Sequence, residues 1–338
     1  MSIEQFYADN NLLTGSLPEY KKWKAIVSLA VQNNRLSGPL PVSYNLSWHI
    51  LQDINLANNT FSGPLPPEWG EFDLDTLDVA NNQLTGPIPS LWKKWKNITT
   101  FDVSNNMLEG NLPEQFGSTW KKVRTIDLQN NSFTGVLPAW EGMGKLEKLH
   151  VFSNELTGNL PSSYSHLHKL RSLDLGNNKL HGPLPSTWGG MNLTDVNLSN
   201  NSLTGPFPTT WKNMRMLQEL DISDNDFSES LVLDNFPMDE LVMLRIDGND
   251  FYGSIKLTTP SPKLRSLNVT SNDFVEPLEE DAFDKRVGTL VLDVRDNHII
   301  CPYPDFPTSG VRYRLPSSAN LAKCLGRYFS CSGAACWR

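Results

Sequence analysis

Leucine and other apolar residues recur along residues 3–300 in one arrangement, L-x-x-L-x-L-x-x-N-x-L-x-G-x-L-P, every 23 to 25 residues. A clean copy comprises Leu170, Leu173, Leu175, Asn178, Leu180, Gly182, Leu184 and Pro185. The asparagine marks thirteen copies: Asn11, Asn34, Asn59, Asn82, Asn106, Asn131, Asn154, Asn178, Asn201, Asn225, Asn249, Asn272 and Asn297. Because each copy must bury its apolar side against its neighbours, the pattern predicts one elongated stack of repeats.

Within one copy, the L-x-L segment alternates with period two, which predicts a short strand with both leucines inward and the residue between them outward. The asparagine lies where the chain must turn, and its amide can bond backbone groups left open there. Stacked copies would therefore form a hydrogen-bonded ladder. The glycine permits a bend, and Leu-Pro disfavours helix, so we expect an extended or tightly turned return path.

The tryptophans follow the same period. Trp23, Trp48, Trp95 and Trp120 each lie eleven residues before a repeat asparagine, and Trp69, Trp92, Trp188 and Trp211 each lie ten residues after one. Trp140 is one residue out of step. A row of tryptophans could form a sugar-binding platform, but fixed positions in the repeat favour buried core residues instead.

This lettering resembles the plant-type subclass of leucine-rich repeats, which is found in plant receptor ectodomains and polygalacturonase-inhibiting proteins. The resemblance covers about residues 3–256. A second resemblance, to surface antigens of trypanosomatid parasites, is carried by Leu65, Pro66, Pro67, Glu68 and Trp69. Both imply a β-rich solenoid, a curved leucine-rich-repeat superhelix with a parallel sheet on its concave face. They also imply a secreted or surface-anchored recognition protein.

The composition of the chain limits which classes of function it supports. The net charge of −8, from 29 Lys and Arg against 37 Asp and Glu, gives no support to nucleic-acid binding. No apolar run is long enough for a transmembrane segment, and no secretory signal is visible. Met1 leads almost directly into the first repeat. Either a capping segment is missing from this sequence, which we favour, or something else covers that edge. The family resemblance leads us to expect an extracellular or cell-surface location, and the oligomeric state stays open.

All four cysteines follow the last repeat: Cys301, Cys324, Cys331 and Cys336. We therefore divide the chain into a solenoid, residues 1–300, and a Cys-containing C-terminal cap, residues 301–338. Clustering favours disulfides in an oxidising compartment, with Cys301–Cys324 and Cys331–Cys336 the preferred pairing of three. Four reduced thiols are the alternative. A zinc site is disfavoured because no C-x-x-C pair occurs.

The outward residue between the two strand leucines should form a column along the solenoid. Its members are Tyr7, Ala30, Asn55, Asp78, Asp102, Asp127, His150, Asp174, Asn197, Asp221, Arg245, Asn268 and Asp293. Like charges one strand apart repel each other. The aspartates are therefore either part of the repeat lettering, bonded to hydroxyls such as that of Ser104, or an acidic strip for a basic partner or a cation.

Two repeats depart from this rule. The seventh has His150 and Phe152, and the eleventh mixes apolar and ionic residues around Arg245. Exposed aromatic, Met and Arg side chains are typical of interface centres, although drift at unconstrained positions is the alternative. The candidate partner-binding residues are Asp102, Arg124, Asp127, Lys148, His150, Phe152, Arg171, Asp174, Met243 and Arg245.

Eight N-x-S/T sequons occur, little more than chance predicts. The candidate glycosylation sites are Asn45, Asn97, Asn192, Asn197 and Asn268. Asn58, Asn130 and Asn200 directly precede repeat asparagines, and we expect the turn to leave little room for a glycan there.

Catalytic motifs such as G-x-S-x-G and H-E-x-x-H are absent, and we expect no enzyme activity, cofactor or metal. His166 and His168 fit surface polar residues better than metal ligands. The sequence thus predicts a recognition protein that binds a protein, peptide or glycan through the concave face. A shielding coat glycoprotein without a specific ligand is the alternative.

Overall fold

The computed structural model describes residues 3–18, 23–46, 48–231, 236–237, 239–253, 255, 263–275, 289–298, 311–314, 330–332 and 335–337. At 45–46, 311–314, 330–332 and 335–337 it describes the backbone alone. The chain forms two compact units, Met1–Lys179 (unit 1) and Leu180–Arg338 (unit 2).

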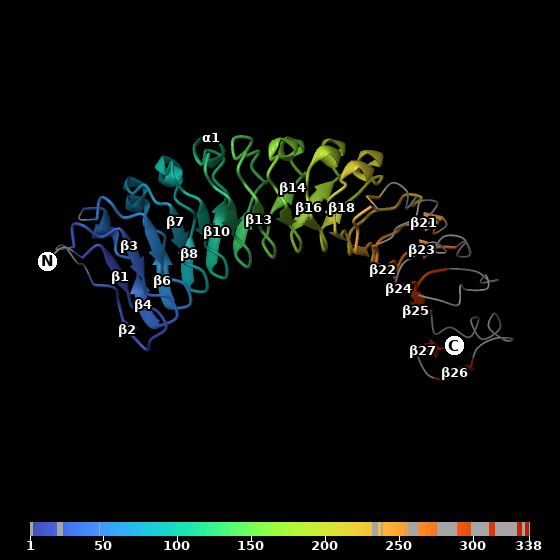
Figure 1. The fold of residues 1–338 in the computed structure, drawn as a ribbon, viewed down its shortest axis with the longest axis horizontal. Helices are drawn as coiled ribbons and strands as arrows, with labels where there is room; N and C mark the ends of the chain where they lie inside the picture. The colour runs from blue at the N-terminus through green and yellow to red at the C-terminus, as the bar shows by residue number, and fades with distance from the viewer. Residues whose placement is uncertain are drawn as a thin grey trace. The chain divides into compact units, whose positions relative to one another are not determined.

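In unit 1 each L-x-L segment forms a short strand, as the period-two pattern predicts, and the strands stack in chain order from blue to green in Figure 1. They are β1 (Gln5–Tyr7), β3 (Ser28–Ala30), β5 (Asp53–Asn55), β7 (Thr76–Asp78), β9 (Thr100–Asp102), β11 (Thr125–Asp127), β13 (Lys148–His150) and β15 (Ser172–Asp174). Neighbours pair in parallel, with Ile126 opposite Phe101 and Leu149. These central residues are buried, so the flanking residues form an outward face, here called the strand face.

The return path of unit 1 is extended, as the L-x-G-x-L-P lettering predicts. Its strands are β2 (Thr14–Gly15), β4 (Arg35–Pro39), β6 (Thr60–Pro64), β8 (Gln83–Gly86), β10 (Met107–Asn111), β12 (Ser132–Thr134) and β14 (Thr157–Gly158). From β2 to β12 they pair in a second parallel sheet, which the sequence reasoning did not foresee. Gly38, Gly63 and Gly86 have φ near +80°, a conformation that favours glycine.

Short helices follow the Leu-Pro pairs. Unit 1 has the 3-10 helices η1 (Val42–Leu46), η2 (Pro67–Glu71), η3 (Ser90–Lys94) and η4 (Ser162–His166), and the α-helical turn α1 (Phe116–Thr119). Pro66, Pro89 and Pro161 immediately precede η2, η3 and η4, where the fixed φ and absent N–H of proline cost nothing.

Unit 2 continues the same pattern. Its elements are β16 (Lys179–Gly182, beginning at the last residue of unit 1), η5 (Ser186–Gly190), β17 (Asp195–Asn197), β18 (Ser202–Leu203), η6 (Thr209–Asn213), β19 (Glu219–Asp221), β20 (Met243–Arg245), β21 (Tyr252–Gly253), β22 (Ser266–Asn268), β23 (Asp273–Phe274), β24 (Leu290–Asp293), β25 (Val311–Arg314), β26 (Ser330–Ser332) and β27 (Ala335–Trp337). β25 lies in the segment predicted as cap, yet pairs in parallel with β24. The boundary at residue 300 stays a prediction.

The tryptophans at repeat positions belong to the core, as predicted. Trp48, Trp69, Trp92, Trp95, Trp120, Trp188 and Trp211 are fully buried, while Trp23 is only partly buried. Trp69 and Trp92 donate from Nε1 to the carbonyls of Pro41 and Pro66, each at 3.0 Å and each in the preceding repeat. The indoles therefore fill the core and also tie successive repeats together.

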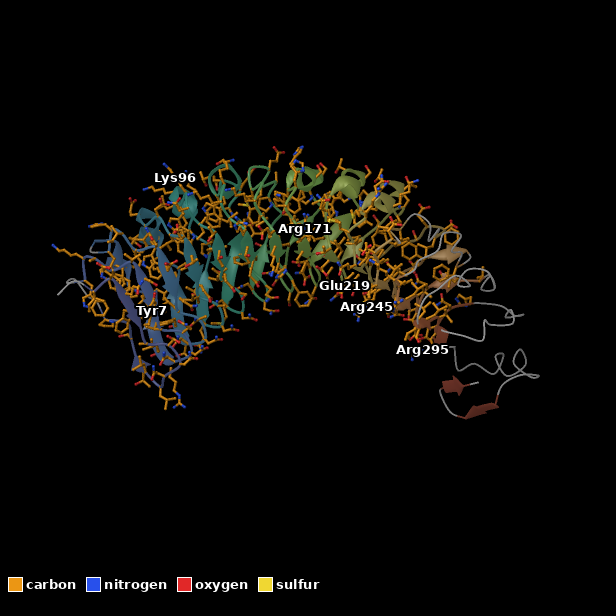
Figure 2. The ribbon with its side chains drawn as sticks, in the orientation of Figure 1. Tyr7, Lys96, Arg171, Glu219, Arg245 and Arg295 are labelled. Carbon is orange, nitrogen blue, oxygen red and sulfur yellow. The ribbon has the colours of Figure 1, made fainter. Side chains whose placement is uncertain are left out.

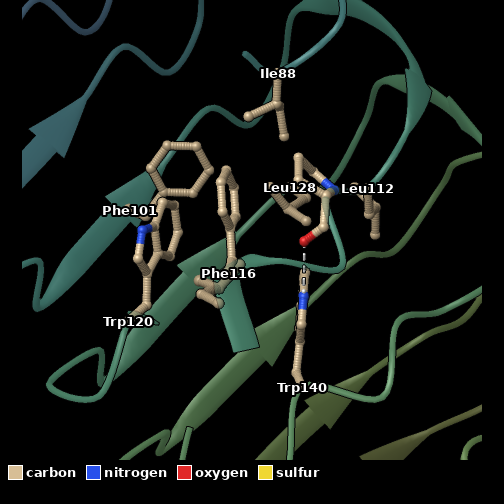
Figure 3. Close-up of a pocket in the computed structure, with 9 residues that line it drawn as sticks. Ile88, Phe101, Leu112, Phe116, Trp120, Leu128 and Trp140 are labelled. Carbon is tan, nitrogen blue, oxygen red and sulfur yellow. Dashed lines mark hydrogen bonds between the residues drawn. The ribbon is translucent and has the colours of Figure 1, made fainter. Parts of the chain in front are cut away.

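Trp140, the residue out of step, reaches the same kind of acceptor. Its Nε1 donates to the carbonyl of Pro113 at 3.1 Å, drawn as the dashed line in Figure 3. Its backbone has φ +43°, a conformation rare for a bulky residue. The left-handed backbone accompanies the one-residue shift, and the indole remains buried at the core position.

The repeat asparagines form the predicted ladder. Asn154 donates from Nδ2 to the carbonyls of Leu128 at 3.0 Å and Val151 at 3.1 Å, and its Oδ1 accepts the N–H of Phe133 at 3.0 Å. Each asparagine side chain therefore bonds to backbone groups of the preceding repeat, and these bonds form the ladder. The residue before each ladder asparagine has positive φ in all thirteen repeats, as at Asn33, Asn105 and Ser153.

Candidate functional site

The register confirms the predicted column on the strand face of unit 1. Asp78, Asp102, Asp127, His150 and Asp174 are consecutive Cα partners on β7, β9, β11, β13 and β15. Each of these side chains is partly buried. The column is therefore continuous across five strands, with the histidine between two aspartates.

The column aspartates have a structural role, as one of the two sequence interpretations expected: the hydroxyl of Ser104 bonds Asp102. The backbone partners of these aspartates were not predicted. Oδ1 of Asp78, Asp102 and Asp127 accepts the backbone N–H two residues on, at 3.1, 2.9 and 3.2 Å respectively. Asn55 accepts in the same way, from Ala57. This arrangement fixes the turn that leaves the strand. The signal was present, because Asp and Asn commonly accept from a backbone N–H two residues later.

Burial also shapes the charge of this column. It raises the pKa of Asp102 to about 6, assisted by the carboxylates of Asp127 and Asp78 and opposed by hydrogen bonds from Ser104. Burial also raises the pKa of Asp78. Below about pH 6, protonation of Asp102 therefore relieves part of the repulsion along the strip.

His150 lies between charged neighbours. Its Nδ1 is 3.7 Å from Oδ2 of Asp127, and its Nε2 is 2.9 Å from the hydroxyl of Ser172. The interaction with Asp127 raises the pKa of His150; burial and Lys148 oppose this shift, and Asp174 adds to it. The protonated ring would place a positive charge in the middle of the acidic column.

Basic residues flank His150 at the strand starts. Arg124 forms an ion pair with Glu147, and Lys148 begins β13 with an exposed side chain. Arg171 directly precedes β15 (Figure 2). Of the ten candidate residues, the structure thus brings eight together in unit 1: Asp102, Arg124, Asp127, Lys148, His150, Phe152, Arg171 and Asp174. Phe152 is partly buried, two residues beyond His150.

The other two candidates, Met243 and Arg245, lie on β20 of unit 2. Arg245 occupies the column position of β20, so a cation again stands where other repeats have a carboxylate. Its Nη1 is 3.5 Å from Oδ2 of Asp221 on β19. Burial raises the pKa of the nearby Asp247 to about 6. This pair forms a separate patch in its own unit.

The sequon asparagines differ in their surroundings. Asn192 is exposed, Asn97 donates to Oδ2 of Asp73 at 2.8 Å, and Asn197 and Asn268 lie in the strand-face column. Nδ2 of Asn130, the atom that would carry a glycan, donates to Asn105 at 2.8 Å. The side chain of Asn45 lies outside the described residues, so glycosylation there stays a prediction.

The predicted disulfides fall mainly on residues that the structure leaves out. Cys301 and Cys324 lie outside the described residues. Cys331 and Cys336, known by their backbone alone, are directly opposed in the antiparallel pair β26–β27. Both pairings stay predictions.

Where α1 meets the repeat of Trp140, the packing of core residues leaves a gap too small to hold a water molecule (Figure 3). Its wall consists of core residues, among them Phe101, Phe116 and Trp120, and offers no cluster of polar side chains. Within the described ranges, no three His, Cys, Asp or Glu side chains converge as metal ligands, and no helix has the length and apolarity to cross a bilayer. The strand face is therefore the better candidate site.

Comparison with known families supports the repeat assignment. Leucine-rich-repeat family models match residues 51–72, 73–95, 97–119, 121–180, 192–214 and 213–229. The ectodomain of the Arabidopsis receptor kinase HAESA, solved with the peptide hormone IDA and the co-receptor SERK1, superposes with a TM-score of 0.70 at 26% identity over 89% of this chain. The chain is a leucine-rich-repeat protein of the plant type. No curated protein matches it by sequence.

Two further structures show how widely this repeat fold is used. The ectodomain of the Arabidopsis thaliana receptor kinase GASSHO1/SCHENGEN3, in complex with CASPARIAN STRIP INTEGRITY FACTOR 2, aligns over 92% of the chain at 25% identity with a TM-score of 0.70. A plant ice-binding protein aligns over 68% of the chain and 73% of its own at 24% identity, with a TM-score of 0.57. This leucine-rich-repeat chain spans only 42% and 56% of the GASSHO1/SCHENGEN3 and HAESA ectodomains. The fold therefore leaves the function to be argued from the surface.

Proposed function

We propose that this leucine-rich-repeat chain is an extracellular or cell-surface recognition domain. It binds a peptide or protein segment through the strand face of unit 1, with His150 and Phe152 at the centre. The HAESA and GASSHO1/SCHENGEN3 ectodomains, solved with a peptide hormone and an integrity factor respectively, support a ligand-binding role for this type of solenoid.

The observation that carries the proposal is the loss of a structural aspartate at His150. On the neighbouring strands, Asp102, Asp127 and Asp174 each accept the backbone N–H that fixes the following turn. His150 has no carboxylate to accept this N–H, although such a hydrogen bond contributes about 0.5–1.5 kcal/mol to the stability of the fold. A partly exposed aromatic follows two residues later, among exposed basic side chains. Aromatic and arginine side chains, here Phe152 and Arg124, are typical of interface centres.

The test is affinity capture with the recombinant chain followed by mass spectrometry. The double variant His150→Ala/Phe152→Ala is compared with Glu155→Ala/Lys179→Ala, which removes an exposed ion pair of unit 1. We expect at least one protein to be retained by wild type and control and lost from the His150/Phe152 variant. Equal retention by all three would exclude this face as the binding site, and failure of the wild type to retain any protein would favour a coat protein without a specific ligand.

A further inference from the structure

A row of cations borders the proposed site at the strand starts. Lys122, Arg124, Lys145, Lys148, Lys169 and Arg171 lie in the turns that enter β11, β13 and β15 or at the beginning of those strands. We call these six residues the basic edge. All but Arg171 are exposed, and Arg171 is partly exposed. The chain as a whole carries a net charge of −8, whereas the basic edge carries a local excess of positive charge.

The backbone ladder shows that the basic edge is one continuous surface. The N–H of Glu147 donates to the carbonyl of Arg124 at 2.8 Å, and the N–H of Arg171 donates to that of Glu147 at 2.9 Å. Lys122, Lys145 and Lys169 each lie nine residues before a ladder asparagine. They therefore occupy the same position in three successive repeats, and adjacent strands are about 4.8 Å apart.

Few carboxylates offset these charges. Glu147 pairs with Arg124, and Lys122 contacts the amide oxygen of Asn97. Within the part of the chain that the structure describes, no ion pair involves Lys145, Lys148 or Lys169. Asp73 and Asp75, at the same edge, precede β7, two strands before β11, and Asp75 interacts electrostatically with Lys122. Three stacked lysines repel one another, and an anionic partner would relieve that repulsion.

We propose that the basic edge binds an acidic polypeptide segment, rich in Asp or Glu, whose continuation lies on the strand face at His150 and Phe152. The inference rests on the proposed function and adds the chemistry of the ligand. Phe152 supplies an apolar contact beside the charges, which suits a segment that mixes acidic and apolar side chains.

A long polyanion fits this surface less well. The carboxylates of Asp78, Asp102 and Asp127 occupy the adjoining column, and together with the net negative charge they would repel an extended acidic glycan or nucleic acid. Among the described residues, the exposed aromatic side chains on which a sugar ring could stack are Tyr7 and Tyr252, in distant repeats. A short acidic segment needs only the basic edge.

Fluorescence anisotropy with a labelled poly-glutamate peptide tests the proposal, with poly-lysine and heparin as comparison ligands. The variant Lys122→Glu/Lys145→Glu/Lys169→Glu is matched in charge by Lys24→Glu/Lys93→Glu/Lys212→Glu, at exposed lysines elsewhere. We expect the basic-edge variant to weaken poly-glutamate binding about tenfold, equivalent to about 1.4 kcal/mol, and the control to weaken it less than about twofold. Added salt should weaken wild-type binding. Circular dichroism of both variants establishes that they are folded.

The proposal is overturned if wild type does not bind poly-glutamate, if both variants lose binding equally, or if heparin binds more tightly with the same dependence on the three lysines. Its failure is distinguishable from that of the proposed function. If the captured partner is lost from His150→Ala/Phe152→Ala but kept by the basic-edge variant, only the acidic-segment proposal fails. If poly-glutamate binding depends on the basic edge but the partner survives the His150/Phe152 change, the proposed centre is wrong.

Discussion

A ladder asparagine stabilises two repeats at once. Asn154 is buried and satisfies carbonyls of its own turn and of the preceding repeat, while its oxygen holds the N–H of Phe133. No other residue type combines two donors and an acceptor in so short a side chain. This explains why asparagine occupies this position in all thirteen repeats.

Replacing this residue should be costly. Asn154→Ala leaves buried backbone donors and acceptors without partners, so we expect a loss of about 2–4 kcal/mol in the free energy of unfolding. Lys179→Ala, which breaks only the exposed 2.9 Å pair with Glu155, should change it by under about 0.5 kcal/mol. Urea unfolding of both variants measures the difference. Equal midpoints would contradict the ladder's role.

His150 makes stability depend on pH. Since its pKa is raised in the folded state, the fold favours the protonated ring, and that contribution is complete below the unfolded pKa of about 6.5. It is lost as pH rises through the folded pKa. Asp127 and Asp174 face the ring from β11 and β15, and Lys148 lies on its own strand. We expect an NMR titration to give a pKa above 6.5, and His150→Gln to remove this part of the pH dependence. A pKa at or below 6.5 would contradict this prediction.

At the scale of elements, two pairs of successive short helices, η2 with η3 and η5 with η6, require glycine where they meet. A Cβ on Gly189, in η5, would lie 2.4 Å from the carbonyl oxygen of Thr210 in η6. Gly70 shows the same crowding against Leu91, in η3. In these two pairs the helices therefore approach at the backbone.

Two adjacent glycines allow a matched experiment. Gly189→Ala should destabilise unit 2 by about 1–3 kcal/mol, because the neighbouring backbone must shift to admit the methyl group. Gly190→Ala meets nothing within 4 Å and should be nearly neutral. Thermal unfolding of the two variants compares them directly. A larger loss at Gly190 would mean that the packing of η5 on η6 is wrongly described.

The elements also show where prediction from sequence stops. The strands and the extended return path follow from the period and from Leu-Pro. Pairing of the return paths into a second sheet does not, since its hydrogen bonds join different repeats and leave no mark in any single copy. The left-handed residue before each ladder asparagine was predictable in principle, because Asn33, Asn105 and Asn130 are of the type that tolerates positive φ.

The candidate site was only half visible in the sequence. The order Asp127, His150, Asp174 follows from the repeat register alone. The hydrogen bonds that Asp102 and Asp127 accept from the following turn depend on local backbone geometry, and the partial burial that raises the pKa of Asp102 depends on neighbouring strands. Alignment of Lys122, Lys145 and Lys169 becomes meaningful only when the turns are stacked.

At the scale of the whole molecule, the cysteines offer a direct test. Opposed residues of an antiparallel pair have Cα atoms about 4.5–5.5 Å apart, within the range of disulfides, and Cys331 and Cys336 are opposed in this way. We expect no thiol to react with Ellman's reagent in the folded protein, and four to react after reduction in denaturant. Peptide mapping should then recover Cys331–Cys336. Four reactive thiols in the folded protein would contradict this pairing.

The ladder has a consequence for the history of such chains. Each repeat offers its successor the same carbonyls and N–H groups that it uses on its predecessor. A repeat duplicated or deleted by unequal recombination therefore meets a partner that already matches. The length of the strand face can change between generations without a new interface arising between repeats, while substitutions at outward positions such as His150 alter the chemistry of that face.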